Sequence, residues 1–474
     1  MPNLLFFDYE SSDTRVNFGQ VCELSFILTD DRFKILEKKE LKCRLKPNVV
    51  PSIGAMMANS ITPQTLKNAP LSHYQLVLEN YKWFKKLSPT YFTGFNITSF
   101  DIEFYRRMLF KSLIPDWYQT NTNGNKIHDV LPQVRAAKFI NRNCIATKLN
   151  PKGNDSFKLQ DLAEVGNFNH GVSHSSTVDC LNTIEVAKKV KQGAPEIWEA
   201  SLKSAHRTDA EKVINSQKIF TTFEFFYGRI RLFLQKHLFY HNLYRWSICW
   251  DLKHHPKDYI NLDRENLSKA LQEAPKVIRT FKQNKNNVIM NKELGLNYEP
   301  YDKIGMNEIL ERSKILDQNP QFINSISSIL EDLAREKKEA NQIEPLFEET
   351  IYAGGINISS KDKINMNNFH KVDLKGKLSL IEKFTEERYF YFAKCLLYEE
   401  YSKEQLPESL YNEMHKHFAK RLTSTDNEKW ETFASFYKEC DDHREKYKDD
   451  ENKLKILEGY NNYVEEMEKK FENV

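Results

Sequence analysis

The feature that most constrains this chain is a short apolar run that ends in two carboxylates. Residues 4–7 are Leu-Leu-Phe-Phe, and Asp8, Tyr9 and Glu10 follow directly. Such a run is typical of a buried strand. Because side chains two residues apart on a strand point to the same side, Asp8 and Glu10 should project together. Two hard oxygen donors suit Mg²⁺ or Mn²⁺, although this pattern alone is more often a solvated strand end.

The first 190 residues predict an α/β region. Strands are expected at 4–7, 21–28, 42–45 and 90–94, the first three as a meander, and helices at 74–87, 99–113, 159–165 and 175–190. The sequence Gln-Gly-Ala-Pro at 192–195 breaks this pattern. An α/β domain is therefore expected over residues 1–192.

The rest of the chain changes character twice. Short aromatic-rich runs at 218–262 fit a small β-barrel or sheet, helical spacing is expected at 263–340, and Tyr-Ala-Gly-Gly at 352–355 marks a second break. Amphipathic helices follow to the end of the chain. We therefore expect a β-containing domain with a helical connector over 193–350 and a helical domain over 351–474.

Composition argues against several classes of protein. The 474 residues carry 69 Lys and Arg against 66 Asp and Glu, so the net charge of +3 indicates no nucleic-acid partner by itself. The seven cysteines are widely spaced without a Cys-X-X-Cys pair, which argues against a disulfide framework and a structural zinc site and suits the cytoplasm. Acids follow early in the N-terminal sequence, and no apolar run approaches about 18 residues, so neither a signal peptide nor a membrane span is expected.

Two further carboxylates lie near predicted helix starts. Asp101 follows Thr-Gly-Phe-Asn at 93–96 and lies in the first turn of a helix, where favouring the helix dipole is the simpler explanation. Asp179 lies one turn inside the helix expected at 175–190, on the side that should face the sheet. A carboxylate buried there needs a cation or a partner. His174 directly precedes this helix, and a lone histidine is usually structural or solvent-exposed.

Taken together, the order of Asp8 and Glu10, then Asp101, then His174 and Asp179 resembles the DEDDh exonucleases. That resemblance implies that four carboxylates hold two Mg²⁺ ions about 4 Å apart, with Mn²⁺ as a substitute. It also implies that a neutral His174 takes the proton from the attacking water.

The whole chain resembles the bacterial exonuclease I family. The matching motifs are DYE at 8–10, ITPQ at 61–64, TGFN and FD within 93–101, SFKL at 156–159, HSSTVD at 174–179, KILDQNPQ at 314–321 and YAGG at 352–355. The resemblance implies an N-terminal ribonuclease-H-like α/β domain, an SH3-like β domain and a C-terminal helical domain that close around a strand. It implies 3′→5′ degradation of single-stranded DNA to 5′-mononucleotides in DNA repair and recombination.

The resemblance also implies roles for individual residues. Asp8, Glu10, Asp101 and Asp179 match the metal ligands, and His174 matches the general base. Contacts to the substrate are implied for Glu10, Lys158, Arg106, Ile61, Trp117, Arg135 and Arg142. Lys158 stands where the family has an arginine, and it offers a point charge in place of a fork. The residue after His174 is serine where the family usually has aspartate, but that neighbour is not a ligand.

A local basic cluster lies within residues 135–158. It consists of Arg135, Lys138, Arg142, Lys148, Lys152 and Lys158, against the single acid Asp155. Phosphates of a strand could lie along it, although a solvated face remains an alternative. In the resembled family a basic surface receives the acidic C-terminal tail of single-stranded-DNA-binding protein, and this cluster is a candidate. The aromatic residues within 218–250 are expected mostly in a core, with base stacking as the alternative.

Two other functions remain open at this point. One is a DEDDh nuclease that trims RNA. The other is a catalytically lapsed clamp that binds single strands and recruits repair partners, against which the presence of all five site residues speaks. The resemblance further implies a monomer.

Overall fold

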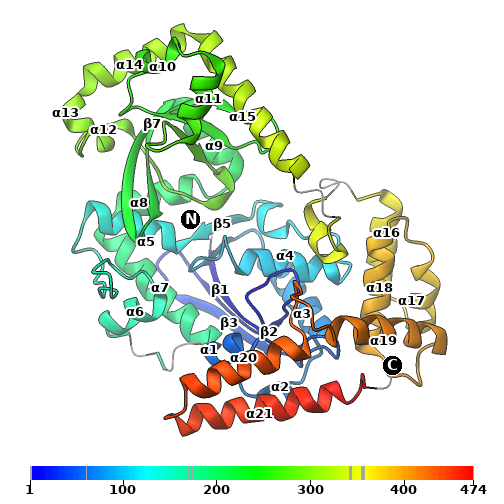
Figure 1. Ribbon diagram of the computed structural model, residues 1–474. Coiled ribbons are helices and arrows are strands. Elements are labelled where there is room, and N and C mark those ends of the chain that lie inside the picture. Colours follow the sequence, from blue (N-terminus) through cyan, green and yellow to red (C-terminus); the bar gives the residue numbers. More distant parts are fainter. Residues whose placement is uncertain are drawn as a thin grey trace. The chain divides into compact units, whose positions relative to one another are not determined.

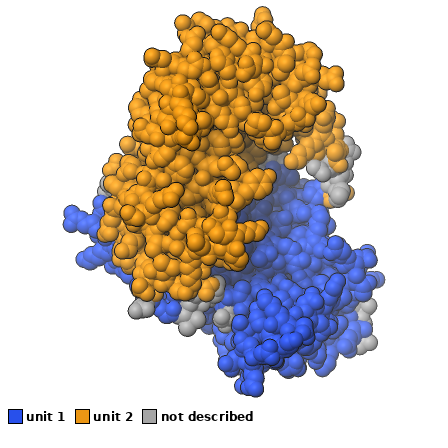
Figure 2. Space-filling model, turned by 60° about the vertical axis from the view of Figure 1, so that its left-hand side comes forward, with its two compact units in different colours: residues 1–125, 170–181, 345–474 blue, residues 126–169, 182–344 orange. Residues whose placement is uncertain are grey.

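The computed structural model describes residues 3–59, 61–168, 170–171, 175–340, 344–353 and 358–472 (Figure 1). These residues fall into two units, which Figure 2 colours separately. The first unit combines residues 1–125, 170–181 and 345–474, and the second combines 126–169 and 182–344. The three-domain division expected from the sequence stays a prediction.

A mixed sheet organises the first unit. Its strands are β1 (Leu4–Ser11), β2 (Val21–Thr29), β3 (Ile35–Lys42) and β4 (Tyr91–Gly94). They lie in the order β3-β2-β1-β4, with β1 antiparallel to β2 and parallel to β4. The central position of β1 explains its apolar start, since Leu4 to Phe7 are all buried.

Helices of the first unit come from both ends of the chain. They are α1 (Ile53–Asn59), α2 (Pro63–Lys67), α3 (His73–Lys86), α4 (Asp101–Lys111), the start of α7 (Ser176–Gly193), α16 (Ser360–Phe369), α17 (Leu374–Ile381), α18 (Glu387–Glu400), α19 (Glu408–Leu422), α20 (Phe433–Lys446) and α21 (Glu451–Glu468), with short 3₁₀ turns at Gln119–Asn121 and Phe347–Tyr352. The C-terminal helix α21 packs on α20, α1 and α2. Tyr460 of α21 donates a hydrogen bond to the carbonyl of Ile61 at 2.7 Å.

Aromatic rings join α3 to the sheet. Phe84 of α3 packs against Phe7 of β1, Phe26 of β2 and Phe92 of β4, with ring centroids 5.5, 6.0 and 5.0 Å apart. All four rings are almost fully buried. This cluster holds three strands at fixed spacing beneath the end of β1 that carries the acids.

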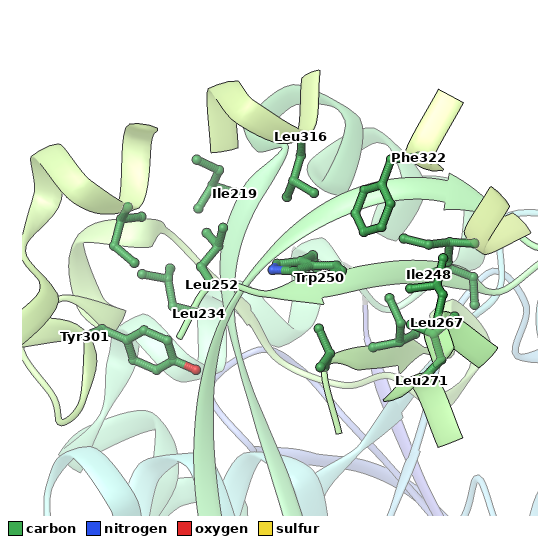
Figure 3. Packing of buried hydrophobic residues seen from close by; sticks show 14 of the residues in the cluster. Ile219, Leu234, Ile248, Trp250, Leu252, Leu267, Leu271, Tyr301, Leu316 and Phe322 are labelled. Atoms are coloured by element: carbon green, nitrogen blue, oxygen red, sulfur yellow. The ribbon is translucent and has the colours of Figure 1, made fainter. Parts of the chain in front are cut away.

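The second unit contains an antiparallel sheet in the order β10-β6-β7-β8-β9. The helices and strands of the second unit are β5 (Lys126–Asp129), α5 (Val130–Ile140), α6 (Leu159–Val165), α8 (Pro195–Lys203), α9 (Arg207–Gln217), β6 (Ile219–Phe226), β7 (Arg229–Tyr240), β8 (Ser247–Asp251), α10 (Lys257–Ile260), α11 (Arg264–Gln272), β9 (Ile278–Phe281), a 3₁₀ turn at Gln283–Lys285, β10 (Ile289–Met290), α12 (Lys292–Gly295), α13 (Tyr301–Ile304), α14 (Met306–Gln318) and α15 (Pro320–Ala340). Trp250 of β8 is fully buried and contacts Phe322 of α15, with Leu267 of α11 in the same core (Figure 3).

Two sequence-based expectations need correction. The third strand runs over Ile35–Lys42 and not over 42–45, because most of its residues are exposed and polar and give no apolar signal. The stretch 263–340 is not wholly helical, since β9 and β10 extend the second sheet. Both strands are too short to show a period in the sequence.

All seven cysteines are free and buried. Across the described ranges, the structure contains no helix with the length and hydrophobicity needed to cross a membrane.

Gly94 allows β4 and the following turn to approach β1 closely. A Cβ at this position would lie 2.8 Å from the carbonyl oxygen of Phe7 and would overlap the side chain of Ile97. We predict that Gly94→Ala lowers the free energy of unfolding by about 1–3 kcal/mol, as overpacking does. Urea denaturation measures this change. Gly459→Ala in α21 is the matched control, because its Cβ would make ordinary contacts 3.4 Å from Pro63 and should not destabilise. Equal stabilities for the two variants would contradict the prediction.

Candidate active site

Three carboxylates meet at the end of β1. One oxygen from each of Asp8, Glu10 and Asp179 lies within 4.8 Å of the others. Asp8 and Glu10 alternate along β1 as the strand period requires, and Asp179 comes from the first turn of α7. The three residues are partly exposed, so a solute can reach them. Carboxylates 171 positions apart in sequence (179 − 8) thus share one point.

Asp101 is attached to the same strand through the backbone. It is the first residue of α4 and is 3% exposed. Its Oδ1 accepts a hydrogen bond of 3.0 Å from the amide of Tyr9, which stands between Asp8 and Glu10. The ring of Tyr9 points into the core, where its hydroxyl bonds to Asn80. The start of α4 therefore holds Asp101 against the backbone of β1 between Asp8 and Glu10.

The electrostatics of this cluster are strongly unfavourable to negative charge. Burial is the main cause that raises the pKa of Asp8 well above its usual range, and the charges of Asp101 and Glu10 raise this pKa further. Burial, followed by the charges of Asp179 and Glu23, raises the pKa of Glu10 to about 9. Like charges held together at low dielectric produce such shifts, and a cation at the same point reverses them.

These residues fit a divalent cation. Hard carboxylate oxygens at this mutual spacing are the donor set that Mg²⁺ and Mn²⁺ take. Asp8, Glu10 and Asp179 would hold such an ion, and Asp101 lies close enough to perturb the pKa of Asp8.

Glu23 of β2 also faces this cluster, and the sequence motifs missed it. It is 5% exposed and lies opposite Glu10 in the β1–β2 register. A signal was present, because it is the one charged residue in the otherwise uncharged strand sequence Val-Cys-Glu-Leu-Ser-Phe-Ile-Leu-Thr.

The remaining candidate residues of the first unit have diverse surroundings. Arg106 bonds to Asn121 Oδ1 at 2.6 Å and reaches the hydroxyl of Tyr352 at 3.4 Å. Ile61 is 5% exposed. Trp117 is 2% exposed and packs edge-on against another aromatic ring, which argues against its predicted contact with substrate. His174 and the Gly-Gly of the 352–355 motif lie outside the described residues.

The basic cluster belongs to the second unit and is only partly available. Lys158 and Arg142 are exposed. Arg135 is half-buried, with its guanidinium 4.1 Å from the ring centre of Phe225, and burial lowers its pKa. Lys148 pairs with Glu164. The exposed cations of this cluster, such as Lys158 and Arg142, therefore do not form one continuous basic face. This weakens the case for a nucleic-acid strand that lies along the whole cluster.

The chain is similar in sequence to known proteins. Residues 5–187 match the Exonuclease (RNase_T) family, and that range contains all four carboxylates. Exodeoxyribonuclease I of Buchnera aphidicola subsp. Acyrthosiphon pisum (strain APS) is 27% identical over 215 residues, which are 45% of this chain and 52% of that protein. The chain thus matches this relative over about half of its length.

Solved structures match the fold over nearly the whole chain. Escherichia coli exonuclease I in complex with a dT13 oligonucleotide has a TM-score of 0.82 at 21% identity and covers 98% of this chain and 100% of that one. A structure of SSB/exonuclease I with an inhibitor has a TM-score of 0.81 at 20% identity, again over 98% and 100%. These likenesses confirm the predicted fold class, and with the sequence matches they confirm the predicted resemblance to exonuclease I.

The raised pKa of Glu10 predicts how the metal-free protein responds to pH. In the folded state the pKa of Glu10 is raised to about 9, whereas the unfolded chain releases this proton near the ordinary pKa of 4.5. Folding then binds a proton, so stability falls as pH rises between these values. With chelator present, the melting temperature should decline from pH 5 to pH 9 more steeply in wild type than in Glu10→Gln. Calorimetry measures both profiles.

The exposed Glu265 supplies the control, because Glu265→Gln should keep the wild-type slope. Saturating Mn²⁺ should raise the wild-type melting temperature most at high pH. Parallel profiles for wild type and Glu10→Gln would contradict this account.

Proposed function

Because this chain is similar to exodeoxyribonuclease I in its N-terminal sequence and in its overall fold, we propose that it is a 3′→5′ exonuclease acting on single-stranded DNA. It would release 5′-mononucleotides. The observation that carries the proposal is the meeting of Asp8, Glu10 and Asp179 within 4.8 Å, with Asp101 bonded to the strand between them. Four gathered carboxylates have little structural value without a cation.

The proposed cofactor is Mg²⁺, as two ions, with Mn²⁺ as a substitute. When bound, the metal lowers the pKa of a water nucleophile and offsets charge on the phosphate. The carboxylates of Asp8, Glu10, Asp101 and Asp179 would hold the ions. The backbone amide of Tyr9 orients Asp101, and the buried side chain of Tyr9 bonds to Asn80. We assign His174 the role of general base for the water proton.

Substrate contacts extend the proposal beyond the carboxylates. Lys158 and Arg142 are exposed cations suited to phosphates. Arg106 is held in place by Asn121 and Tyr352, so it would present a fixed guanidinium. Ile61 and Arg135 remain candidates, whereas the burial of Trp117 leaves it the weakest of the set.

We further propose a cytoplasmic monomer that works in DNA repair alongside single-stranded-DNA-binding protein. The seven reduced cysteines support the compartment. The solved structure of SSB/exonuclease I supports the choice of partner. The acidic C-terminal tail of single-stranded-DNA-binding protein would bind cations near Arg142.

Removing one carboxylate tests the centre directly. Asp179→Asn should abolish release of nucleotides and weaken metal binding, because one charged oxygen donor is lost, while binding of a single strand persists. Timed digestion of a 5′-labelled oligonucleotide and fluorescence anisotropy measure the two properties. Asp449→Asn, an exposed aspartate, is the control and should digest normally. Full activity of Asp179→Asn would refute the proposed centre.

The role of His174 has a separate test. His174→Ala should lower turnover by about 10²–10⁴-fold, the usual contribution of a general base, with strand binding unchanged. Single-turnover digestion measures this rate. His170→Ala, four residues earlier, should digest at nearly the wild-type rate. Equal rates for the two variants would remove His174 from the mechanism.

One competition assay separates the remaining functions. Labelled DNA and RNA single strands, with a DNA duplex, are digested together with and without chelator. The proposal expects metal-dependent loss of the DNA single strand first. Preference for RNA would favour an RNA-trimming nuclease, and binding without any digestion would favour a lapsed clamp.

A further inference from the structure

We infer that Glu23 is a positioning residue that fixes the start of α7 and thereby sets the place of Asp179 in the metal centre. The inference rests on the proposed function, whereas the contacts of Glu23 that support it are independent of that function. Glu23 lies on β2, 5% exposed, and faces the first turn of α7. No catalytic step is assigned to it.

Both oxygens of Glu23 have defined partners. Oε1 accepts from the amide of Ser176 at 3.2 Å and from its hydroxyl at 2.7 Å. Oε2 pairs with Lys42 Nζ on β3 at 3.1 Å. Ser176 is the first residue of α7 and is fully buried. These contacts bind both oxygens of the Glu23 carboxylate to neighbouring elements, so Glu23 holds the start of α7.

A second set of contacts fixes the next residue of the helix. Thr177 Oγ1 lies 2.6 Å from Ser25 Oγ of β2 and donates to Glu40 Oε2 of β3 at 2.7 Å. Lys42 Nζ also pairs with Glu40, at 3.0 Å. The strands β2 and β3 thus form a hydrogen-bonded seat for α7, composed of Glu23, Ser25, Glu40 and Lys42, which we call the α7 seat.

The α7 seat acts on the metal centre through a short rigid path. Asp179 lies three residues after Ser176, and its amide bonds to the carbonyl of Ser175 at 2.9 Å. A helical turn transmits displacement of its first residue directly to the fourth. Movement of Ser176 away from β2 would therefore move the Asp179 carboxylate away from Asp8 and Glu10.

The charge of Glu23 would be costly without such a role. Glu23 stands directly opposite Glu10 across the β1–β2 pair, and like charges at opposite positions destabilise a sheet. Lys42 stands opposite Glu23 on its other side and offsets that charge. An apolar residue at position 23 would avoid the repulsion, but it could not accept two hydrogen bonds from Ser176.

Direct titration with Mn²⁺ tests the inference on the full chain. Isothermal calorimetry of Glu23→Ala should show Mn²⁺ affinity weaker by about 10-fold or more, the usual effect of losing a residue that orients ligands. Glu23→Gln keeps an oxygen acceptor for Ser176 and should recover affinity to within about threefold of wild type. Glu37→Ala on β3, which pairs with Lys86 away from α7, should bind as wild type.

Kinetics supply the second measurement. Glu23→Ala should need a higher Mg²⁺ concentration for half-maximal digestion and should lower kcat, with KM for the strand unchanged. A folded Glu23→Ala that binds Mn²⁺ like wild type would overturn the inference, and so would a Glu23→Gln as weak as Glu23→Ala. If Glu23→Ala does not fold, Ser176→Ala decides: reduced Mn²⁺ affinity supports the α7 seat, and unchanged affinity overturns it.

These outcomes are separable from failure of the proposed function. If wild type digests no nucleic acid but Glu23→Ala still weakens Mn²⁺ binding, the positioning role stands and the nuclease proposal fails. If wild type digests DNA and Glu23→Ala binds Mn²⁺ as tightly as wild type, the positioning role is refuted and the proposed function stands.

Discussion

Mutual repulsion among closely spaced, partly buried carboxylates is the constraint on which the rest of this structure depends. Asp8, Glu10 and Asp179 place oxygens within 4.8 Å of one another, and the pKa of Glu10 rises to about 9 as a result of burial and neighbouring charge. A fold that maintains such a cluster must hold each acid from a separate element. It must also obtain compensating stability elsewhere, because the metal-free centre opposes folding.

The first unit meets that requirement with three attachments. The aromatic packing of Phe84 on three strands anchors β1. The Tyr9 amide ties Asp101 and the start of α4 to the same strand. The α7 seat ties Asp179 to β2 and β3, through Glu23 and Ser176. The attachments combine buried ring packing with hydrogen bonds from the Tyr9 amide and from the buried Ser176, so the acids converge before any cation arrives. Preorganisation of this kind lowers the cost of binding metal.

Sequence patterns predicted the parts of the site that depend on local geometry. The two-residue strand period placed Asp8 and Glu10 together, and a strand–turn–helix pattern placed Asp101 at a helix start. Features set by long-range packing were not predicted: the lone charge of Glu23 in its strand gave no sign of its bond to Ser176, 153 residues away, and the burial of Trp117 depends on tertiary neighbours. The polar edge strand β3 was misplaced because it has no apolar period. The family resemblance supplied the proposed roles of His174 and of the proposed DNA-contact residues, which residue spacing alone left open.

Locating the bound metal is the sharpest test of the proposed centre. Crystals of the full chain soaked in Mn²⁺, with data collected at the manganese absorption edge, would show any bound ion by its anomalous signal. We predict anomalous peaks in contact with oxygens of Asp8, Glu10, Asp101 and Asp179, and loss of signal in Asp179→Asn. Well-ordered density for these four side chains without anomalous signal at saturating Mn²⁺ would contradict the central claim that they form a metal centre.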